Sequence, residues 1–272
     1  MKDLEGKVAV VTGAGSGIGR GTALALAESG MHVVVADLNE ESAKAVAQEL
    51  GGKSIAVRTD VADRASVEAL ADAAYNEFGA VHVLHNNAGV ALMMRLDTMK
   101  DVDWDWILSV NLKGVINGLQ AFLPRFKAQD GEKHIVNTAS MAGMFAPQTL
   151  GAYNATKFAV VAISETLREE VAPDGIGVSV LCPGVVGTNI MQNTLRDRPP
   201  GGADMQMPAI GPNDSETFRN VLMPEAVGRL VRDAIVDNEP YIFTHPELGA
   251  IAQARFDRIM AAFERASQRA NA

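Results

Sequence analysis

Short apolar runs alternate with longer stretches of helical spacing along most of the chain. The apolar runs predict strands at 7–11, 32–36, 54–58, 81–85, 134–138 and 177–181, and 241–243 is a candidate seventh. Helical spacing predicts helices at 16–29, 40–50, 63–78, 104–127 and 153–171. Strands nearly continuous in Val, Ile and Ala are buried on both faces, so the sheet is expected to be mainly parallel. The prediction is an α/β fold with a doubly wound, seven-stranded sheet and helices on both faces.

Two segments near the C-terminal end break this alternation. Residues 189–223 contain Pro199-Pro200-Gly201-Gly202 and lack periodicity, which predicts a substrate loop or lid. Residues 247–270 predict an amphipathic helix, and the sequence leaves open whether it packs on its own subunit or on a neighbour. No linker or long-period repeat divides the chain, so 1–272 is expected to form a single domain.

Composition narrows the classes of partner. The 272 residues are 47% hydrophobic, enough for a large core, and the net charge of -9 argues against nucleic acid as a partner. The first residues lack the basic start and apolar run of a signal peptide, and no apolar stretch approaches the roughly 18 residues of a membrane span. We therefore expect a cytoplasmic protein without a membrane partner. Cys182 is the single cysteine and the histidines show no HxxxH spacing, so no metal site is predicted.

A glycine-rich loop follows the first predicted strand and opens the first predicted helix. Backbone N–H groups of such a loop, with the positive end of the helix, favour a pyrophosphate. The candidate cofactor-binding residues here are Gly13, Ser16, Gly17, Ile18 and Gly19. The spacing is TGxxxGxG rather than GxGxxG, and a tight strand-to-helix turn can use glycine for steric reasons alone.

Asp37 follows the second predicted strand, 24 residues after Gly13. That separation suits an acid that binds the adenosine ribose hydroxyls, and the alternative is a cap for the helix that follows. At about 4 Å and an effective dielectric near 20, a carboxylate would repel a 2′-phosphate by about 4 kcal/mol per unit charge. Leu38 and Ser16 supply no compensating cation. NAD is therefore favoured over NADP.

Polar breaks also follow the third and fourth predicted strands. Asp60 and Val61 are candidates to hold the adenine, and Asn87, Ala88 and Gly89 to lie beside the adenosine ribose. Each break, taken alone, is equally compatible with an ordinary turn at a strand end.

The candidate chemistry lies after the fifth predicted strand. Ser140 follows that strand, and Tyr153 and Lys157 are spaced i, i+4, so they share one helix face. A tyrosine pKa near 10 falls by about three units for about 4 kcal/mol of preferential phenolate stabilisation, which a lysine and a cationic nicotinamide could supply. Such a tyrosine is a general acid for ketone reduction and a base for alcohol oxidation. YxxxK alone is also common on amphipathic helices without function.

These motifs occur together in the order typical of the short-chain dehydrogenase/reductase family, which the chain resembles over residues 7–188. The resemblance implies a Rossmann-type fold and homotetramers formed through helices 104–127 and 153–171. It implies Tyr153 as acid/base, Ser140 as partner of the substrate oxygen, and Lys157 as perturber of Tyr153 and ligand of the nicotinamide ribose. Asn111 would hold a water linked to Lys157. The residues implied to lie against the nicotinamide are Pro183, Gly184, Val186 and Thr188.

The substrate is expected to be a small apolar molecule. Met141, Met144, Phe145 and Met191 are candidates to wall its pocket, although each is equally compatible with the core. Segments 110–124 and 241–246 resemble family members that oxidise benzylic alcohols. The predicted enzyme is an NAD-dependent alcohol dehydrogenase that acts on apolar, aromatic secondary alcohols or ketones. The alternatives are an NADP-linked ketone, steroid or sugar reductase, and a non-catalytic NAD-binding redox sensor.

Overall fold

The computed structural model spans residues 1–272 and describes residues 1–205 and 220–271. Its centre is one sheet in the order β3-β2-β1-β4-β5-β6-β7, and every neighbouring pair of strands is parallel. The strands are β1 (Val8–Thr12), β2 (His32–Asp37), β3 (Ile55–Arg58), β4 (Val83–Asn86), β5 (Lys133–Thr138), β6 (Ile176–Cys182) and β7 (Tyr241–Phe243). The predicted seven-stranded sheet, including the candidate last strand, is confirmed.

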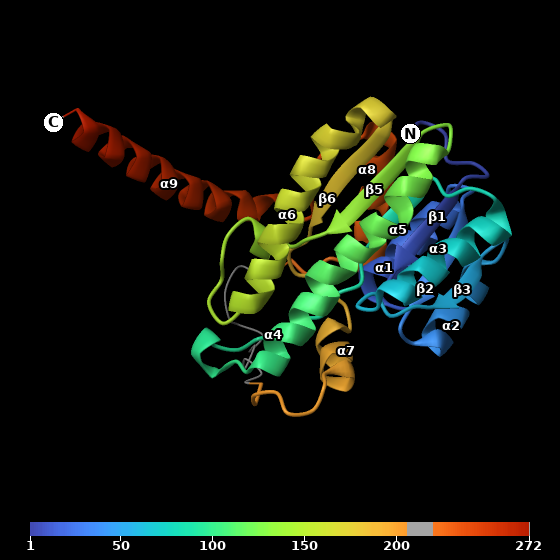
Figure 1. Ribbon diagram of the computed structural model, residues 1–272, viewed down its shortest axis with the longest axis horizontal. Coiled ribbons are helices and arrows are strands. Elements are labelled where there is room, and N and C mark those ends of the chain that lie inside the picture. Colours follow the sequence, from blue (N-terminus) through green and yellow to red (C-terminus); the bar gives the residue numbers. More distant parts are fainter. Residues whose placement is uncertain (206–219, 272) are drawn as a thin grey trace.

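Helices cover both faces of this sheet (Figure 1). They are α1 (Gly17–Glu28), α2 (Glu40–Leu50), α3 (Arg64–Phe78), α4 (Asp101–Leu108), α5 (Gly114–Ala128), α6 (Gly151–Val171), α7 (Ile190–Asp197), α8 (Pro224–Asp237) and α9 (Gly249–Ala270). One apolar cluster joins the sheet to α1, α2 and α8, and another joins its other face to α3, α5 and α6. The central strands are wholly buried, which explains their nearly continuous apolar sequence.

Two expectations about local structure were wrong in part. The helix predicted over 104–127 is divided into α4 and α5 by a π-helical turn, Ser109–Lys113. The predicted aperiodic loop, 189–223, begins with a helix, α7; its residues 206–219, among them Met207 and Gly211, lie outside the described part. Both differences bear on the site, because the π-helical turn carries Asn111 and α7 reaches the cofactor end.

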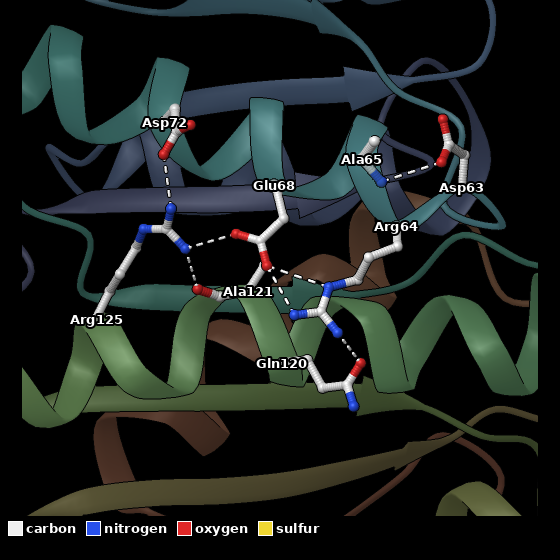
Figure 2. A network of polar contacts seen from close by, with 8 residues as sticks. All are labelled: Asp63, Arg64, Ala65, Glu68, Asp72, Gln120, Ala121 and Arg125. Carbon is white, nitrogen blue, oxygen red and sulfur yellow. Dashed lines mark hydrogen bonds and ion pairs between the residues drawn. The ribbon is translucent and has the colours of Figure 1, made fainter.

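Charged side chains join α3 to α5 on one face of the molecule, as Figure 2 shows. Arg125 of α5 donates hydrogen bonds to Glu68 and Asp72 of α3, with N···O distances of 2.9 and 2.6 Å. Arg64 of α3 binds the same Glu68 at 2.9 Å and also contacts Gln120 of α5. Because these half-exposed side chains share partners, they are held in one geometry. Surface ion pairs contribute most to stability when they form such a network.

The last helix, α9, leaves the body of the molecule and extends away from it (Figure 1). None of its residues is buried, and the predicted amphipathic helix is confirmed with bounds Gly249–Ala270. Throughout the described part of the chain, we find no helix whose length and hydropathy would suit a membrane span.

Candidate active site

The candidate site lies where the strand order reverses, between β1 and β4. Ligands of open parallel sheets bind outside the carboxyl ends of the strands at this point. A cavity of about 330 Å³ opens there, a size typical of ligand sites. Predicted residues on its wall are Gly13, Ser16, Gly17, Ile18, Asp37, Leu38, Asp60, Val61, Asn87, Ala88, Gly89, Tyr153, Lys157, Pro183 and Thr188. Residues from loops far apart in the sequence thus share one cavity.

The glycine loop is shaped for close approach of a ligand to its backbone. Gly13 has φ +64°, and a Cβ there would lie 2.8 Å from the Ala88 Cα. Ser16 is the N-cap residue of α1, but its side chain makes no capping hydrogen bond to the first turn of the helix, and that turn carries no acidic residue. The N–H groups of that turn are therefore available to an anion, which the helix dipole favours. Gly19 is not on the cavity wall but packs under the loop, where a Cβ would meet the Gly13 carbonyl.

Asp37 stands at the end of β2 with both carboxylate oxygens engaged. Oδ2 accepts a hydrogen bond from Gly15 N and Oδ1 one from Asn39 N, each at 2.9 Å. The cap of α2 is Asn39, whose side chain accepts from Ser42 N, so the alternative reading of Asp37 as that helix's cap does not hold. Asp37 is half-buried on the cavity wall and keeps lone pairs for ligand hydroxyls.

Thr12 ties the turn after β4 to the glycine loop. Its hydroxyl oxygen accepts from the backbone N–H groups of Asn87 and Ala88, at 2.9 and 3.1 Å, and the Asn87 amide donates to the Thr12 carbonyl at 2.8 Å. In the turn after β3, the Asp60 carboxylate accepts a hydrogen bond from Ala62 N at 2.9 Å. These bonds hold two walls of the cavity rigidly, as a preorganised site requires.

Tyr153 and Lys157 lie in the first two turns of α6 and face the same cavity. The Lys157 ammonium is buried, donates to the Thr138 carbonyl at 2.9 Å, and lies 5.4 Å from the centre of the Tyr153 ring. Ser140 lies beside the Tyr153 hydroxyl and accepts a hydrogen bond from Ala142 N at 3.1 Å. The structure thus brings together the three residues expected to carry the chemistry.

The ionisation of this pair follows from its burial. Burial raises the pKa of the Tyr153 phenol, and the hydrogen bond to Ser140 lowers it only in part. Burial also lowers the pKa of the Lys157 ammonium to about 8. The protein alone therefore does not supply the depressed tyrosine pKa expected from the sequence. Phenolate formation at neutral pH requires a further positive charge near Tyr153.

Asn111 lies one layer behind the cavity, in the π-helical turn. Its side chain is buried, accepts from Val90 N at 2.8 Å and donates to the Val90 carbonyl at 2.9 Å. A Cβ on Gly89 would lie 3.3 Å from Asn111 and 3.6 Å from Lys157 Nζ, so both side chains flank Gly89. Asn111 therefore shapes the wall next to Lys157; its role in holding a water stays a prediction.

The segment after β6 divides into residues that face the cavity and residues that do not. Pro183 and Thr188 are on the wall, and Thr188 packs against Gly17. Gly184 donates its N–H to Thr244 at 3.0 Å and lies against His245, whereas Val186 packs into the core beside α1 and α8. The predicted contacts of Gly184 and Val186 with the nicotinamide would thus involve their backbone.

The wall formed by α7 was not predicted from the sequence. Asn193 and Arg196 line the cavity, and Asn193 donates to the Ser16 hydroxyl at 3.2 Å. Arg196 forms an ion pair with Asp197 at 2.7 Å, and Asp197 and then Asp37 hold the pKa of its guanidinium above the usual value. A cation thus lines the same cavity as Asp37, close enough for the two charges to interact. Helical spacing in 190–197 was the signal available, although the helix is too short and polar for it to stand out.

The apolar part of the wall differs from the one expected. Trp106, Val110, Val90 and Ile190 line the cavity near Tyr153. Met141, Met144 and Phe145 instead pack in a core cluster behind β5 and β6, and Met191 is not on the wall either. The apolar residues of the wall thus come from α4 and the π-helical turn, from the segment after β4 and from α7, rather than from the methionines.

The family model described as short chain dehydrogenase matches residues 7–199. The chain belongs to this family. It is 44% identical over 212 residues to the putative oxidoreductase SadH of Mycobacterium tuberculosis, a match that covers 76% of this chain and 75% of the relative. The family resemblance predicted from the motifs is therefore confirmed, and the chain is an oxidoreductase of this family.

Two further relatives align with nearly the whole of this chain. A crystal structure of a short-chain dehydrogenase/reductase from Burkholderia phymatum in complex with NAD superposes with a TM-score of 0.87 and 39% identity over 96% of this chain and 97% of that one. The C alpha-dehydrogenase of Sphingobium is 33% identical over 267 residues, which cover 96% of this chain and 87% of the relative. The B. phymatum relative shares the Rossmann-type architecture over this length.

The buried lysine of this short-chain dehydrogenase predicts a pH-dependent stability. Because folding lowers the Lys157 pKa from 10.5 to about 8, the folded protein binds fewer protons than the unfolded chain between those pH values. The free energy of unfolding therefore rises with pH from about 8 to 10.5, by about 3 kcal/mol from this group. Urea denaturation of the cofactor-free wild type and Lys157→Met at pH 8 and 10 measures it. An equal rise in both proteins would contradict the assignment.

Proposed function

We propose that this chain is an NAD-dependent dehydrogenase that interconverts an apolar, aromatic secondary alcohol and its ketone, with Tyr153 as general acid/base. One observation carries the proposal: Tyr153 and the buried Lys157 share a cavity with the glycine loop and Asp37. A proton-transfer pair and a dinucleotide-type site in one cavity are what hydride transfer to or from a carbonyl carbon requires.

The cofactor follows from the fit between the cavity and a dinucleotide. The uncapped N-terminus of α1 suits a pyrophosphate, and Asp37 suits a ribose without a 2′-phosphate. NAD, when bound, supplies the hydride acceptor and a positive nicotinamide ring. The NAD bound in the B. phymatum relative supports this choice. Lys157 would hold the nicotinamide ribose, and Pro183 and Thr188 the nicotinamide end.

Tyr153 would move the proton at the substrate oxygen. In alcohol oxidation its phenolate accepts the hydroxyl proton, and in ketone reduction its phenol donates one. Ser140, beside the Tyr153 hydroxyl, would donate a hydrogen bond to the same substrate oxygen and so fix its position. Lys157, held at the Thr138 carbonyl, would stabilise the phenolate by its charge.

The substrate class follows from the wall next to Tyr153. Trp106, Val110 and Ile190 present apolar surface to the reacting end of the cavity, which suits an aromatic ring. The likeness to the C alpha-dehydrogenase of Sphingobium supports a dehydrogenase, and the resemblance of segments 110–124 and 241–246 to family members that oxidise benzylic alcohols supports that substrate class. A cofactor-absorbance screen of secondary alcohols and ketones with NAD and NADP in parallel tests the proposal. Turnover of benzylic alcohols with NAD is expected.

The alternatives are separated by the same screen. Arg196, which lines the cavity with Asp37 and interacts with its charge, is the observation that favours an NADP-linked reductase, because it is a cation near the adenosine end. Preference for NADP with ketone, steroid or sugar substrates would replace the present proposal. Tight NADH binding without turnover of any substrate would instead identify a non-catalytic redox sensor. The cytoplasmic location and the homotetramer stay predictions.

Arg196 is expected to strengthen NAD binding through the pyrophosphate. Arg196→Gln should weaken NADH affinity about fivefold to tenfold, since a charge-assisted hydrogen bond at a partly exposed site contributes about 1 kcal/mol or slightly more. Fluorescence titration with NADH measures this change. Asp197→Asn is the matched control, because it releases Arg196 from its ion pair and should leave binding equal or tighter. If Arg196→Gln weakens only NADPH binding, the arginine reads a 2′-phosphate instead.

A further inference from the structure

The segment that follows α7, residues 198–205, binds the N-terminal end of α4 (Figure 1). We call this segment the strap. Its Ala203 is buried in an apolar cluster, and its Met205 packs against the same cluster. Tyr153 and Trp106, which line the cavity, pack against that cluster as well. The strap therefore belongs to the apolar layer around the reacting end of the cavity.

A buried ion pair joins the strap to α4. The Arg198 guanidinium binds the Asp103 carboxylate through Nη2 and also through Nε, the latter at 3.1 Å. The two side chains are only 13% and 1% exposed, unlike those of the surface ion pairs. Removal of one partner from a buried pair is strongly unfavourable, because it leaves the other charge unpaired. The pair therefore holds the two segments in one arrangement.

The same carboxylate also binds the backbone of both segments. Asp103 Oδ2 accepts hydrogen bonds from Ala203 N at 3.0 Å and from Lys100 N, at the start of α4, at 3.1 Å. The Lys100 ammonium in turn donates to the carbonyls of Gly201 and Gly202, at 3.2 and 3.4 Å. One side chain thus caps α4 and fixes the strap at the same time.

The helix before the strap is held by different contacts. Asn193 of α7 donates to the Ser16 hydroxyl at 3.2 Å, and Thr194 accepts from Ala91 N at 3.0 Å. These bonds join α7 to the cofactor end of the cavity and do not involve Asp103. Loss of the ion pair should therefore release the strap while α7 keeps its place beside the cofactor.

We propose that Asp103 is a positioning residue that, through Arg198, fixes the strap behind the apolar wall at Trp106 and so sets the affinity for the apolar part of the substrate. The inference rests on the proposed function, which places the aromatic ring of the alcohol at that wall. Neither Asp103 nor Arg198 is among the described residues on the cavity wall, so neither takes part in proton or hydride transfer.

Asp103→Asn removes the ion pair selectively. Asparagine can keep its carbonyl oxygen on Ala203 N and Lys100 N, whereas its amide would face the Arg198 guanidinium donor against donor. In steady-state kinetics with the best benzylic alcohol, KM for the alcohol should rise about tenfold, with kcat and NADH affinity changed less than about twofold. The matched control, Asp97→Asn, breaks an exposed ion pair near the start of α4 and should change none of these quantities.

Two further variants separate the ion pair from its charges. Gly202→Ala leaves both charges in place, but its Cβ would collide with the Arg198 guanidinium and the Asp103 carboxylate, so it should raise KM in the same way. Asp103→Asn combined with Arg198→Met should raise KM about tenfold, as one substitution does, and not about a hundredfold, because the two substitutions remove one interaction.

Tryptophan fluorescence reports on the strap without catalysis. Trp104 and Trp106, the two tryptophans of the chain, flank Asp103 in α4 and pack against the cluster that contains Ala203. Acrylamide should quench the fluorescence of the cofactor-free protein more strongly in Asp103→Asn than in the wild type, and equally in Asp97→Asn and the wild type. Circular dichroism checks that all variants keep the same helix content.

Three outcomes would overturn the proposal. They are an unchanged KM in Asp103→Asn, an equal rise of KM in Asp97→Asn, and tryptophan quenching that is the same in Asp103→Asn as in the wild type. If no alcohol is turned over by the wild type, the proposed function fails instead. Stronger quenching in Asp103→Asn alone would then still show that Asp103 fixes the strap, so the two failures are distinguishable.

Discussion

Tyr153→Phe is expected to lower kcat for alcohol oxidation by about a hundredfold to ten-thousandfold while leaving NADH affinity unchanged. General acid/base catalysis commonly contributes that much, and the substitution removes the hydroxyl that exchanges the proton while it keeps the ring. The ring packs beside Trp106 in an apolar cluster, so the fold loses little. Steady-state kinetics with the best benzylic alcohol from the screen, together with NADH titration, measure the two quantities.

The pH profile separates a catalytic phenol from a structural one. Because burial holds the Tyr153 pKa above its ordinary value in the free protein, kcat/KM for alcohol oxidation should rise with pH in the wild type. Residual activity of Tyr153→Phe should lack the rise that belongs to the phenol. Tyr75→Phe is the matched control, since it removes a tyrosine hydroxyl that binds Gln129 at 3.0 Å, away from the cavity. Near-normal turnover in Tyr153→Phe would remove the mechanism.

The sheet and the line of polar residues along its edge could be predicted from the sequence because both depend on local patterns. Strands buried on both faces must be nearly continuous in apolar residues, and β1, with all five residues buried, is the clearest case. The parallel order then brings the carboxyl ends of the strands to one edge. Gly13, Asp37 and Asn87 could therefore be assigned to one site before their contacts were known.

The wall formed by α7 could not be predicted, because nothing local holds that helix. Of its eight residues only Thr194 is buried, and Leu195 is 51% exposed, so its apolar residues do not pack into the core. Two tertiary contacts position it instead: Thr194 accepts from Ala91 N at 3.0 Å, and Asn193 donates to Ser16 at 3.2 Å. Partners a hundred or more residues away leave no trace in a short window.

The apolar wall was misassigned for a related reason. Met141 follows β5 on the side of the cofactor site, which made a pocket position plausible, yet its 3-10 turn carries the side chain back into the core beneath α6. Trp106, in α4, and Val110, in the π-helical turn Ser109–Lys113, line the cavity instead. Such a turn changes which side chains face a site, and no residue type marks it.

Asp37→Ala is expected to raise the KM for NAD by about tenfold to a hundredfold. Hydrogen bonds to a charged group contribute about 1.5–3 kcal/mol, and the substitution removes the acceptor for the ribose hydroxyls. It also removes the repulsion of a 2′-phosphate, so the preference for NAD over NADP should fall by about a hundredfold. Parallel determination of kcat/KM with both cofactors measures each effect.

Asp37→Asn separates charge from hydrogen bonding. Asparagine keeps one carbonyl oxygen, so it can still accept from either Gly15 N or Asn39 N and hold most of the local turn. If charge sets the selectivity, Asp37→Asn should relax the cofactor preference nearly as far as Asp37→Ala while it raises the KM for NAD less. Leu38→Arg, added to Asp37→Ala, then places a cation beside the vacated position and should turn the preference toward NADP. An unchanged preference for NAD in all three variants would mean that Asp37 does not decide which cofactor the cavity accepts.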